Sequence, residues 1–598
     1  MNRNRADEYD RGQVSFRMIM LLTLAIAALF LIFCFPTFET SDDATIIRMV
    51  DGSRGSTDPH LIYQNVILGC FYILFYNLPL RLPWYSLVQI LMILISMGVL
   101  AWCTVLLLGR KKGIIMAVMT DLFLGYECIV QIQYTKTAGL AACAGMLLIL
   151  CCGWFMDRAD RRRKAFLYGS GICLIAYGSM LRFAQAAVCV ALMTGGVLYL
   201  LLRLALEESM NSGHRRQGIR HRNRILKLAA VFLAALVIVL LCFGIDSISY
   251  RYGRLSGFKR FDAARIELLD HGMPSYDENA EELKAMGIRR SAYRLLKGWT
   301  FADPDVFTAE VLEQIGSLKE PVDYLNRDQI RGFFSEVPAG MLGRRFFYFF
   351  LAAVLIWIFA GRHDWKDLLC ALYSAAAFAA MYYYLYCHGR YLVNRVDVPM
   401  LLSLGMTFLF LTGVSNPPGM LQERHFSKGD LLTGTCAFAM ILIVMLSPAL
   451  RPDLQLRGGE RAGMFRTYAE RSRQLLHQAS DDPAHLYLAK LYTISDDYAF
   501  GVFDTAPVNC LANILWLGGW SYRSGCYLDI MERYGITNPM RDMIDAENVL
   551  LVDHQVDRTL KYLRSYYHPD ADAREVSAIG DFPVYRVITD NGAEDQNE

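Results

Sequence analysis

The sequence lacks the glycine-rich loops of nucleotide-dependent enzymes. Its short basic segments between apolar runs contain neither a G-x-x-x-x-G-K-[ST] loop nor a G-x-G-x-x-G after a strand. This absence argues against an ATP-driven pump and against an enzyme that uses nucleotide sugars at those segments. A signal-peptide cleavage pattern is also missing after the first apolar run, so we expect that run to be retained as a helix.

Metal and redox signatures are missing as well. Most of the fifteen cysteines lie inside apolar runs, and Cys151 and Cys152 are neighbours without a C-x-x-C partner. Only Cys510 and Cys526 fall in the C-terminal part of the chain. A disulfide between them and two buried free thiols are both open, and we favour the free thiols.

The composition indicates a membrane protein with a sizeable water-soluble part. Of the 598 residues, 54% are hydrophobic and 20% are charged, and the mean hydropathy is +0.26. A soluble protein is less apolar than this, and a chain buried wholly in lipid is less charged. The net charge of +2 says little about partners, because in a membrane protein the distribution of charged residues along the chain matters more than their sum.

Apolar runs of about 20 residues, the length that crosses roughly 30 Å of hydrocarbon, predict about eleven transmembrane helices. They lie near 16–36, 84–108, 113–133, 135–155, 165–181, 184–203, 226–245, 344–361, 366–387, 391–413 and 430–449. The fold class is therefore mainly α, a polytopic helical membrane protein.

Residues 61–78 are apolar but short, and charge decides their placement. If they do not span, the basic segments such as "GRKKG", "DRADRRRK" and "HRRQGIRHRNR" all fall on one side together with the N-terminus. The positive-inside rule then places the N-terminus in the cytoplasm and 61–78 at the interface or in a re-entrant piece.

This topology exports three segments: residues 37–83, residues 246–343 and the C-terminal part. We divide the chain into a transmembrane domain, 1–450, and a soluble extracytoplasmic domain, 451–598. In the latter, "NVLLVD" and "FPVYRVI" are typical of strands and "QVDRTLKYLRSYY" of a helix, which predicts a small α/β domain. The loop 246–343 has helical periodicity, and we expect it to cap the active site.

An acidic dyad, Asp42 and Asp43, follows the first apolar run directly, on what we expect to be a loop. An outward-facing enzyme has no cytosolic nucleotide sugars, so its activated substrate must arrive on a lipid. A polyprenyl-phosphate sugar meets that need if a carboxylate takes the acceptor's proton and cations hold the leaving phosphate. The alternative role for Ser41 or Asp42 is to cap the helix "DDATIIRMV".

The order of first helix, "SDD", "HLIYQNVILGCFYILFY" and "PWYSLVQIL" resembles the GT-C superfamily of lipid-linked glycosyltransferases. The resemblance covers the topology of most of residues 10–450, and its motif is two residues long. It implies a glycosyltransferase of the bacterial cell envelope that acts on a glycan, lipid or protein acceptor, and it implies no nucleic acid partner.

By that resemblance, Asp42 or Asp43 is the catalytic base, with Asp43 slightly favoured, and the other orients it or binds a divalent metal such as Mg²⁺ or Mn²⁺. Such enzymes often use a second acid, for which Glu127 is the candidate and Asp121 the weaker choice. Glu127 is expected to lie inside the third predicted span, and an ionisable side chain within the membrane costs free energy unless it is paired. The alternative for Glu127 is a hydrogen bond to a neighbouring helix.

Cations at the outer helix ends are candidates for the donor phosphate site. Arg390 and Arg395 lie at the outer edge of the tenth predicted span, Arg182 between the fifth and sixth, and Lys136 in the loop after the third. One guanidinium group can donate two parallel hydrogen bonds to the oxygens of a phosphate. The alternative is that such arginines reach lipid headgroups.

Two other function classes stay open. A flippase or polymerase of lipid-linked oligosaccharides would also have many spans and outward arginines, and a scaffold or sensor would use its exported domain to bind a ligand. The aromatics of "LWLGGWSYRSGCY" could stack on sugar rings, although a buried core is the commoner place for such residues.

Overall fold

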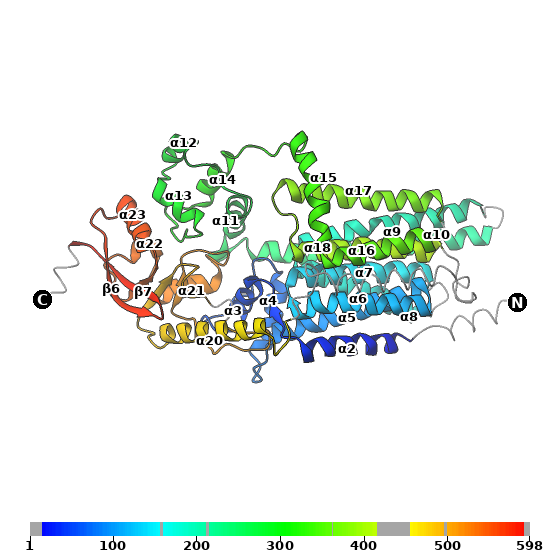
Figure 1. Cartoon of the computed structure of the whole chain (residues 1–598), viewed down its shortest axis with the longest axis horizontal. Coiled ribbons are helices and arrows are strands. Elements are labelled where there is room, and N and C mark those ends of the chain that lie inside the picture. The colour runs from blue at the N-terminus through cyan, green and yellow to red at the C-terminus, as the bar shows by residue number, and fades with distance from the viewer. Residues whose placement is uncertain are drawn as a thin grey trace. The chain divides into compact units, whose positions relative to one another are not determined.

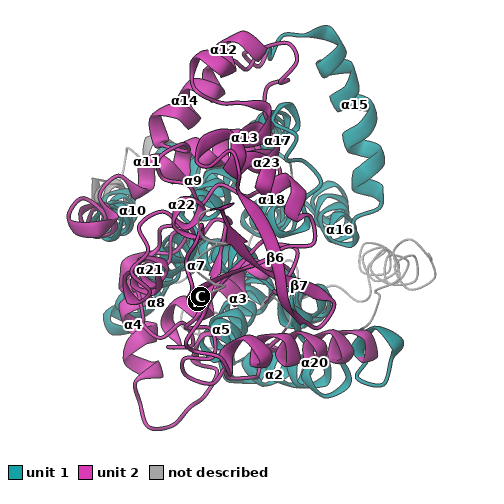
Figure 2. Cartoon of the chain, turned by 90° about the vertical axis from the view of Figure 1, so that its left-hand side faces the viewer, with its two compact units in different colours: residues 1–39, 86–243, 323–462 teal, residues 40–85, 244–322, 463–598 magenta. Residues whose placement is uncertain are grey.

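The computed structural model describes residues 15–155, 160–210, 215–361, 363–415, 455–495 and 499–590. Figure 1 shows the helices and strands in chain order. The chain forms two compact units, each assembled from three separate stretches (Figure 2). Unit 1 comprises residues 1–39, 86–243 and 323–462, and unit 2 comprises residues 40–85, 244–322 and 463–598.

Unit 1 is built from long apolar helices. Nine described helices are long and apolar enough to cross a membrane. They are α2 (Phe16–Phe33), α5 (Trp84–Leu108), α6 (Arg110–Leu124) with its π-helical continuation η1 (Gly125–Val130), α7 (Tyr134–Phe155), α8 (Arg161–Leu181), α9 (Phe183–Met210), α10 (Arg215–Ser249), α17 (Trp365–Cys387) and α18 (Asn394–Ser415). The chain is thus a polytopic helical membrane protein, as its hydropathy predicts.

The two remaining predicted spans behave differently. The one at 344–361 corresponds to α16 (Arg345–Ala360), which is long enough to cross only together with α15 (Arg327–Leu342), and these two helices are bent by 97°. The one at 430–449 lies outside the described residues. Residues 61–78 contain only α4 (Val66–Tyr76), whose eleven residues extend about 17 Å and cannot span the hydrocarbon core.

Helices α7 and α18 form the centre of unit 1. The most apolar stretch of α18 is 100% buried and that of α7 is 83% buried, against 11% for α10. Glycines allow the central helices to approach closely: a Cβ on Gly145 of α7 would lie 2.5 Å from the carbonyl oxygen of Gly171 in α8. Small residues at helix contacts are typical of membrane bundles.

Unit 2 contains a five-stranded sheet in the order β4-β3-β5-β7-β6. Strands β3 (Leu486–Ala489), β4 (Ile514–Trp516) and β5 (Val549–Val552) are parallel, whereas β7 (Phe582–Ile588) is antiparallel to both β5 and β6 (Asp572–Ile579). Every residue of β3, β4 and β5 is buried, because both faces of the sheet are covered. The predicted α/β character of this region is confirmed.

Alternate residues of the sheet enter two different cores. Leu486, Leu488 and Leu551 face a core that includes Phe261, Leu268, Leu295 and Leu312, so the segment predicted as a cap packs on the sheet. Its helices are α11 (Phe258–Arg265), α12 (Ala280–Ala285), α13 (Arg290–Lys297) and α14 (Ala309–Ser317), with short turns η2 (Gly253–Leu255) and η3 (Ile266–Asp270).

The opposite face of the sheet is covered by the end of α20 (Glu460–Ser480), through Leu475, Leu476 and Ala479. Three further helices complete the sheet region: α21 (Gly525–Arg533), α22 (Pro539–Asp542) and α23 (Val556–Tyr566). Unit 2 also includes α3 (Ser41–Val50), which carries the acidic dyad, and α4.

Candidate functional site

The acidic dyad lies in the first turn of helix α3, and not on a loop as the sequence led us to expect. The N-cap residue is Thr40, whose side chain makes no capping bond; its hydroxyl lies 3.3 Å from Oδ2 of Asp42. Neighbouring residues on a helix point about 100° apart. Asp42 is accordingly half-buried, whereas Asp43 is fully buried.

Asp43 ends a chain of hydrogen bonds within unit 2. The hydroxyl of Tyr85 donates to its Oδ1 at 2.7 Å, and the side-chain amide of Gln64 donates to the Tyr85 oxygen at 2.9 Å. Tyr85 and Gln64 are themselves buried. A buried carboxylate held in this way has a fixed orientation.

Helix α3 is held in unit 2 by the distant C-terminal part of the chain. Just beyond its end, the amide of Leu511 donates to the carbonyl of Ser53 at 2.8 Å, and the amide of Gly525 donates to Asp58 at 2.5 Å. The thiol of Cys526 lies 3.6 Å from the carbonyl oxygen of Met49. These contacts join residues more than 450 positions apart and position the dyad.

Cys510 and Cys526 form no disulfide with each other; the Cys526 thiol is buried, as favoured from the sequence, whereas Cys510 is half-buried. Burial raises the pKa of the Cys526 thiol to about 12. A thiol with so high a pKa is protonated at physiological pH and is a poor nucleophile. Cys526 is therefore a packing residue of the α3 contact.

Glu127 and Lys136, both selected from the sequence, meet in unit 1. The Lys136 ammonium group lies 3.2 Å from Oε2 of Glu127, 2.7 Å from the carbonyl oxygen of Glu127 and 2.7 Å from Oε2 of Glu39. Lys136 is fully buried in the first turn of α7, and not in a loop. We name Glu39, Glu127, Lys136, Arg345 and Asn394 the carboxylate–lysine cluster.

A small parallel sheet builds this cluster. Strand β1 (Thr37–Phe38) pairs with β2 (Gln131–Ile132), and the amide of Glu39 donates to the carbonyl of Ile132 at 2.9 Å. Glu127 lies in the π-helical stretch η1, which leads directly into β2. Such π-helical turns occur frequently at functional sites.

Two neighbouring arginines at the start of α16 complete the charged region. Arg345 Nη1 lies 3.7 Å from Glu127, and the Arg345 guanidinium carbon is 4.4 Å from the ring centre of Tyr126. Nη1 is buried and has no hydrogen-bond partner within the described ranges of the chain. The Asn394 amide donates to Glu127 Oε2 at 2.7 Å, so Glu127 is heavily engaged.

Arg344, the N-cap residue of α16, faces a second buried acid. Its Nε lies 3.8 Å from Oδ2 of Asp397, and its guanidinium also donates to the carbonyl of Leu392. The Tyr382 hydroxyl donates to the other Asp397 oxygen at 2.9 Å. Each arginine of the pair thus has a buried carboxylate nearby.

The other cations selected from the sequence lie at helix ends of unit 1. Arg390 lies between α17 and α18, Arg395 follows Asn394 in the first turn of α18, and both arginines are half-buried. Arg182 is the C-cap residue of α8, and its amide donates to the carbonyl of Gly178 at 3.0 Å. Asp121 accepts a hydrogen bond from Thr23 at 2.7 Å and lies deep in α6.

The dyad is a poor fit for a divalent metal. Mg²⁺ requires near-octahedral oxygen coordination. Over the described part of the chain, no three His, Cys, Asp or Glu side chains come together as metal ligands, and one Asp43 oxygen already accepts from Tyr85. We therefore derive no step through a metal ion.

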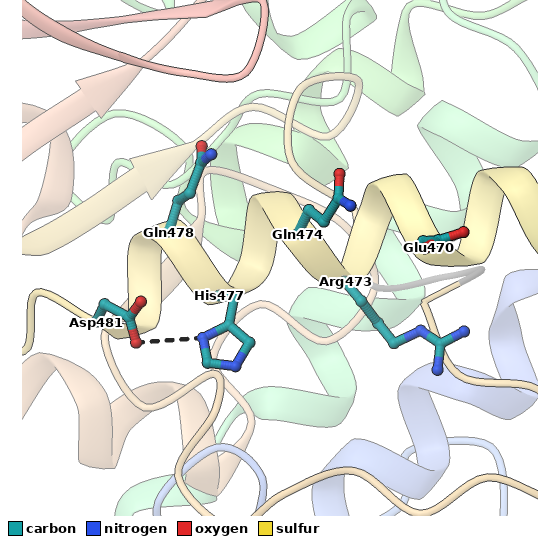
Figure 3. A pocket seen from close by; sticks show the side chains of 6 residues that line it. All are labelled: Glu470, Arg473, Gln474, His477, Gln478 and Asp481. Atoms are coloured by element: carbon teal, nitrogen blue, oxygen red, sulfur yellow. Dashed lines mark hydrogen bonds and ion pairs between the residues drawn. The ribbon is translucent and has the colours of Figure 1, made fainter.

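A hollow lies along helix α20 (Figure 3). Its lining residues all come from this one helix or its end: Glu470, Arg473, Gln474, His477, Gln478 and Asp481. The His477 ring lies 3.2 Å from Asp481, and both side chains are more than 70% exposed. Exposed pairs of this kind contribute little energy, and the hollow does not concentrate chemically reactive groups.

Sequence reasoning missed Arg344, Arg345, Glu39 and Asn394. The signal for the arginines was present in "MLGRRFFYFF", where two guanidinium groups directly precede an apolar run. No local signal identified Glu39 or Asn394, because their importance depends on strand pairing and on contacts between distant helices.

Comparisons with known proteins give a distant likeness only. No protein-family model matches the chain, and no curated protein matches it. Two crystal structures of ArnT from Cupriavidus metallidurans, in the apo state and bound to undecaprenyl phosphate, match at 10% and 12% identity over 95% of this chain and 97% of that chain. The TM-score is 0.34 in both cases, and at that value the likeness carries no argument about this protein.

Proposed function

We propose that this chain is a membrane glycosyltransferase that moves a sugar from a polyprenyl-phosphate donor to an extracytoplasmic acceptor. The observation that carries the proposal is the placement of the acids and cations along the chain. Glu39 contacts Lys136 in the carboxylate–lysine cluster and precedes Asp42 by three residues, so the covalent chain keeps the Cα atoms of Glu39 and Asp42 within about 11 Å.

In the proposed reaction, a hydroxyl oxygen of the acceptor attacks the anomeric carbon of the donor sugar. The bond between that carbon and the phosphate oxygen breaks, and its electron pair leaves with the polyprenyl phosphate. The hydroxyl proton passes to a carboxylate. A base placed in this way contributes on the order of 10² to 10⁴ in rate.

We assign proton acceptance to Asp42, which reverses the slight preference for Asp43 in the sequence-based prediction. A base must come within hydrogen-bond distance of the acceptor hydroxyl. Asp42 is half-buried and therefore accessible, whereas Asp43 is fully buried and holds the Tyr85 hydroxyl. Asp43 is then a positioning residue for the first turn of α3.

Cations of unit 1 would bind the donor phosphate. Arg345 is the best candidate, because Nη1 has no hydrogen-bond partner in the described residues and a guanidinium group suits phosphate oxygens. Arg344, Arg390, Arg395 and Arg182 remain further candidates for the same role. Lys136 is engaged with two carboxylates, so we propose that Lys136 and Glu127 position Arg345.

The test is turnover of a polyprenyl-phosphate sugar by the purified protein in lipid nanodiscs. A panel of hexose, pentose and amino-sugar donors is supplied, with and without a mixture of envelope glycans and lipids as acceptors. Release of polyprenyl phosphate is measured. We expect at least one donor to be consumed, and Asp42→Asn to lower the rate at least 100-fold while donor binding persists.

Asp481→Asn is the matched control, because it removes an exposed acid of unit 2 outside the dyad. It should leave the rate unchanged. Transfer that survives in Asp42→Asn, Asp43→Asn and the double variant would eliminate the dyad as catalytic. Lipid flipping or ligand binding without any donor cleavage would instead favour a flippase or a sensor.

A further inference from the structure

We propose that unit 2 carries a carbohydrate-binding site formed by Tyr63, Arg265, Trp299 and Trp520, which we name the aromatic platform. As a carbohydrate site it is independent of the proposed transferase activity. Its use as the acceptor site rests on that proposed function.

The platform brings together four segments that are distant in the sequence. Tyr63 lies between α3 and α4, Arg265 ends α11, Trp299 follows α13, and Trp520 lies between β4 and α21. The rings of Tyr63 and Trp520 are 5.0 Å apart. Arg265 links them to Trp299: its Nη2 donates to the Tyr63 hydroxyl at 2.9 Å, and its guanidinium carbon is 5.5 Å from the Trp299 ring centre.

The three rings differ in burial from the aromatic core beneath them. Tyr63, Trp299 and Trp520 are half-buried, whereas Phe301 and Tyr522 below are fully or almost fully buried. A ring that serves only as core is covered on both faces. Partly exposed rings leave an apolar surface on which the C–H groups of a sugar can pack.

The backbone holds the platform in unfavourable conformations. Ile62, Trp299 and Arg523 have positive φ values of 66°, 60° and 64°, which bulky side chains rarely adopt. Each lies within the platform or within three residues of it in sequence. Such conformations persist only where surrounding structure enforces them, and they gather at ligand sites.

A close backbone contact holds Trp299 in its positive-φ conformation. Thr300 forms a bridge with Gly518, and the amide of Phe301 donates to the carbonyl of Leu517 at 2.9 Å. A Cβ on Gly518 would lie 1.7 Å from the Trp299 carbonyl oxygen, so only glycine fits. This contact joins Trp299 to the segment that carries Trp520.

Arg265 supplies an unused hydrogen-bond donor beside the rings. The side chain is 1% exposed, and Asp262 accepts from its Nε at 3.1 Å and from its Nη2 at 2.7 Å. Its Nη1 is buried and has no hydrogen-bond partner in the part of the chain that the structure describes. A buried donor without an acceptor destabilises the folded protein, and a sugar hydroxyl or carboxylate oxygen would supply that acceptor.

The position in the sheet also favours a ligand site. Residues 517–520 directly follow β4, one of the three parallel strands. Ligands of α/β sheets bind beyond the carboxyl ends of parallel strands. Carbohydrate is the class that uses partly exposed aromatic rings and a hydrogen-bond donor together, because a sugar has one apolar face and a rim of hydroxyls.

The test uses the full-length protein in nanodiscs on an array of neutral, amino and acidic oligosaccharides. The oligosaccharide that binds best is then titrated by calorimetry. We expect Trp520→Ala to weaken its binding at least tenfold, Trp520→Phe to restore part of the affinity, and Tyr492→Ala, which removes an exposed ring elsewhere in unit 2, to have no effect.

Two results would overturn the proposal: no oligosaccharide on the array binds, or Trp520→Ala and Trp299→Ala bind like the parent protein. Because Trp520→Phe keeps a ring, it also guards against a loss of binding caused by misfolding. Donor hydrolysis without acceptor should be unchanged in Trp520→Ala. If no variant cleaves any donor but binding follows the platform, the transferase proposal fails and the carbohydrate site stands.

Discussion

Lys136 is a fully buried cation whose two carboxylate partners come from different parts of the chain. Removing one partner of a buried ion pair typically costs about 3–5 kcal/mol, because the other charge is left without compensation. We expect Lys136→Met to lower the thermal unfolding temperature in detergent markedly. It should also reduce donor turnover, since Glu127 would lose its ammonium partner and keep only Asn394 and Arg345.

The double variant Lys136→Met, Glu127→Gln separates these effects. It removes one buried charge of each sign, so stability should recover in part. Turnover should stay low if the cluster positions Arg345. Recovery of both stability and turnover would mean that the cluster acts only as structure.

Arg345 and Arg395 are two half-buried cations that differ in their contacts, because Arg345 lies against Glu127 whereas Arg395 is a candidate from the sequence alone. If Arg345 holds the donor phosphate, Arg345→Gln should weaken donor binding about tenfold or more and slow transfer, because the leaving phosphate loses a charge partner. Arg395→Gln tests the assignment made from the sequence. Donor titrations that are identical for the parent protein, both single variants and the double variant would remove these arginines from the site.

At the scale of single elements, the last residue of the short helix α22, Asp542, bonds back to the segment that precedes the helix. Asp542 accepts hydrogen bonds from the amides of Thr537 and Asn538 at 2.7 and 2.8 Å. Burial raises the pKa of Asp542. The hydrogen bonds from these amides, from Arg541 and from the Thr537 hydroxyl lower it by a larger amount, so the pKa lies below its usual value of 3.8. A carboxyl whose pKa is depressed on folding stabilises the folded state above its unfolded pKa.

Asp542→Asn should therefore lower the unfolding temperature of unit 2 at neutral pH by a few degrees, corresponding to about 1–2 kcal/mol. The difference from the parent protein should shrink as the pH falls below 3.8, where the carboxyl of the unfolded chain becomes protonated, and should vanish below the lower pKa of the folded state. Scanning fluorimetry between pH 3 and pH 7 measures this. A difference that does not vary with pH would contradict the assigned cause.

Local sequence signals predicted most elements of this fold. Hydropathy located nine spanning helices, and alternation of strand and helix patterns located β5, β7 and α23. The same signals could not reveal that α11 to α14 pack on the C-terminal sheet, since that core depends on contacts between distant apolar side chains. They also favoured a loop for the dyad over the alternative of a helix "DDATIIRMV" capped by Ser41 or Asp42, whereas α3 begins at Ser41 with Thr40 as its N-cap residue.

The candidate site was predictable in part. Asp42, Asp43, Glu127 and Lys136 stand out because charge beside or inside an apolar run is unusual. The burial difference between the two aspartates follows from helix geometry and from Tyr85, and neither is visible in the letters "SDD".

At the scale of the whole molecule, the composition of unit 2 constrains the membrane topology. Its three stretches, 40–85, 244–322 and 463–598, belong to one compact unit, so they must lie on one side of the bilayer. Six spanning helices, from α5 to α10, separate the first stretch from the second, and an even number agrees with this requirement. The positive-inside rule then predicts that the side is extracytoplasmic and that the N-terminus is cytoplasmic.

Epitope tags inserted near Leu80 and Glu320 and fused to the C-terminus should all be reached from outside intact cells. A tag at the N-terminus should be reached only after permeabilisation. A C-terminal tag on the same side as the N-terminal one would refute both the topology and the outward placement of the dyad.

The three-part assembly of unit 2 also sets the order of events during synthesis. Helix α3 emerges early, yet the residues that hold its end, such as Gly525 and Cys526, are made more than 450 residues later. On the predicted topology, that last portion must cross the membrane before the apolar faces of the two earlier stretches are covered, and until then these stretches are exposed to proteases and to aggregation. The dyad can acquire its final position only when the chain is nearly complete, so a prematurely ended chain would contain most of its membrane helices and remain inactive.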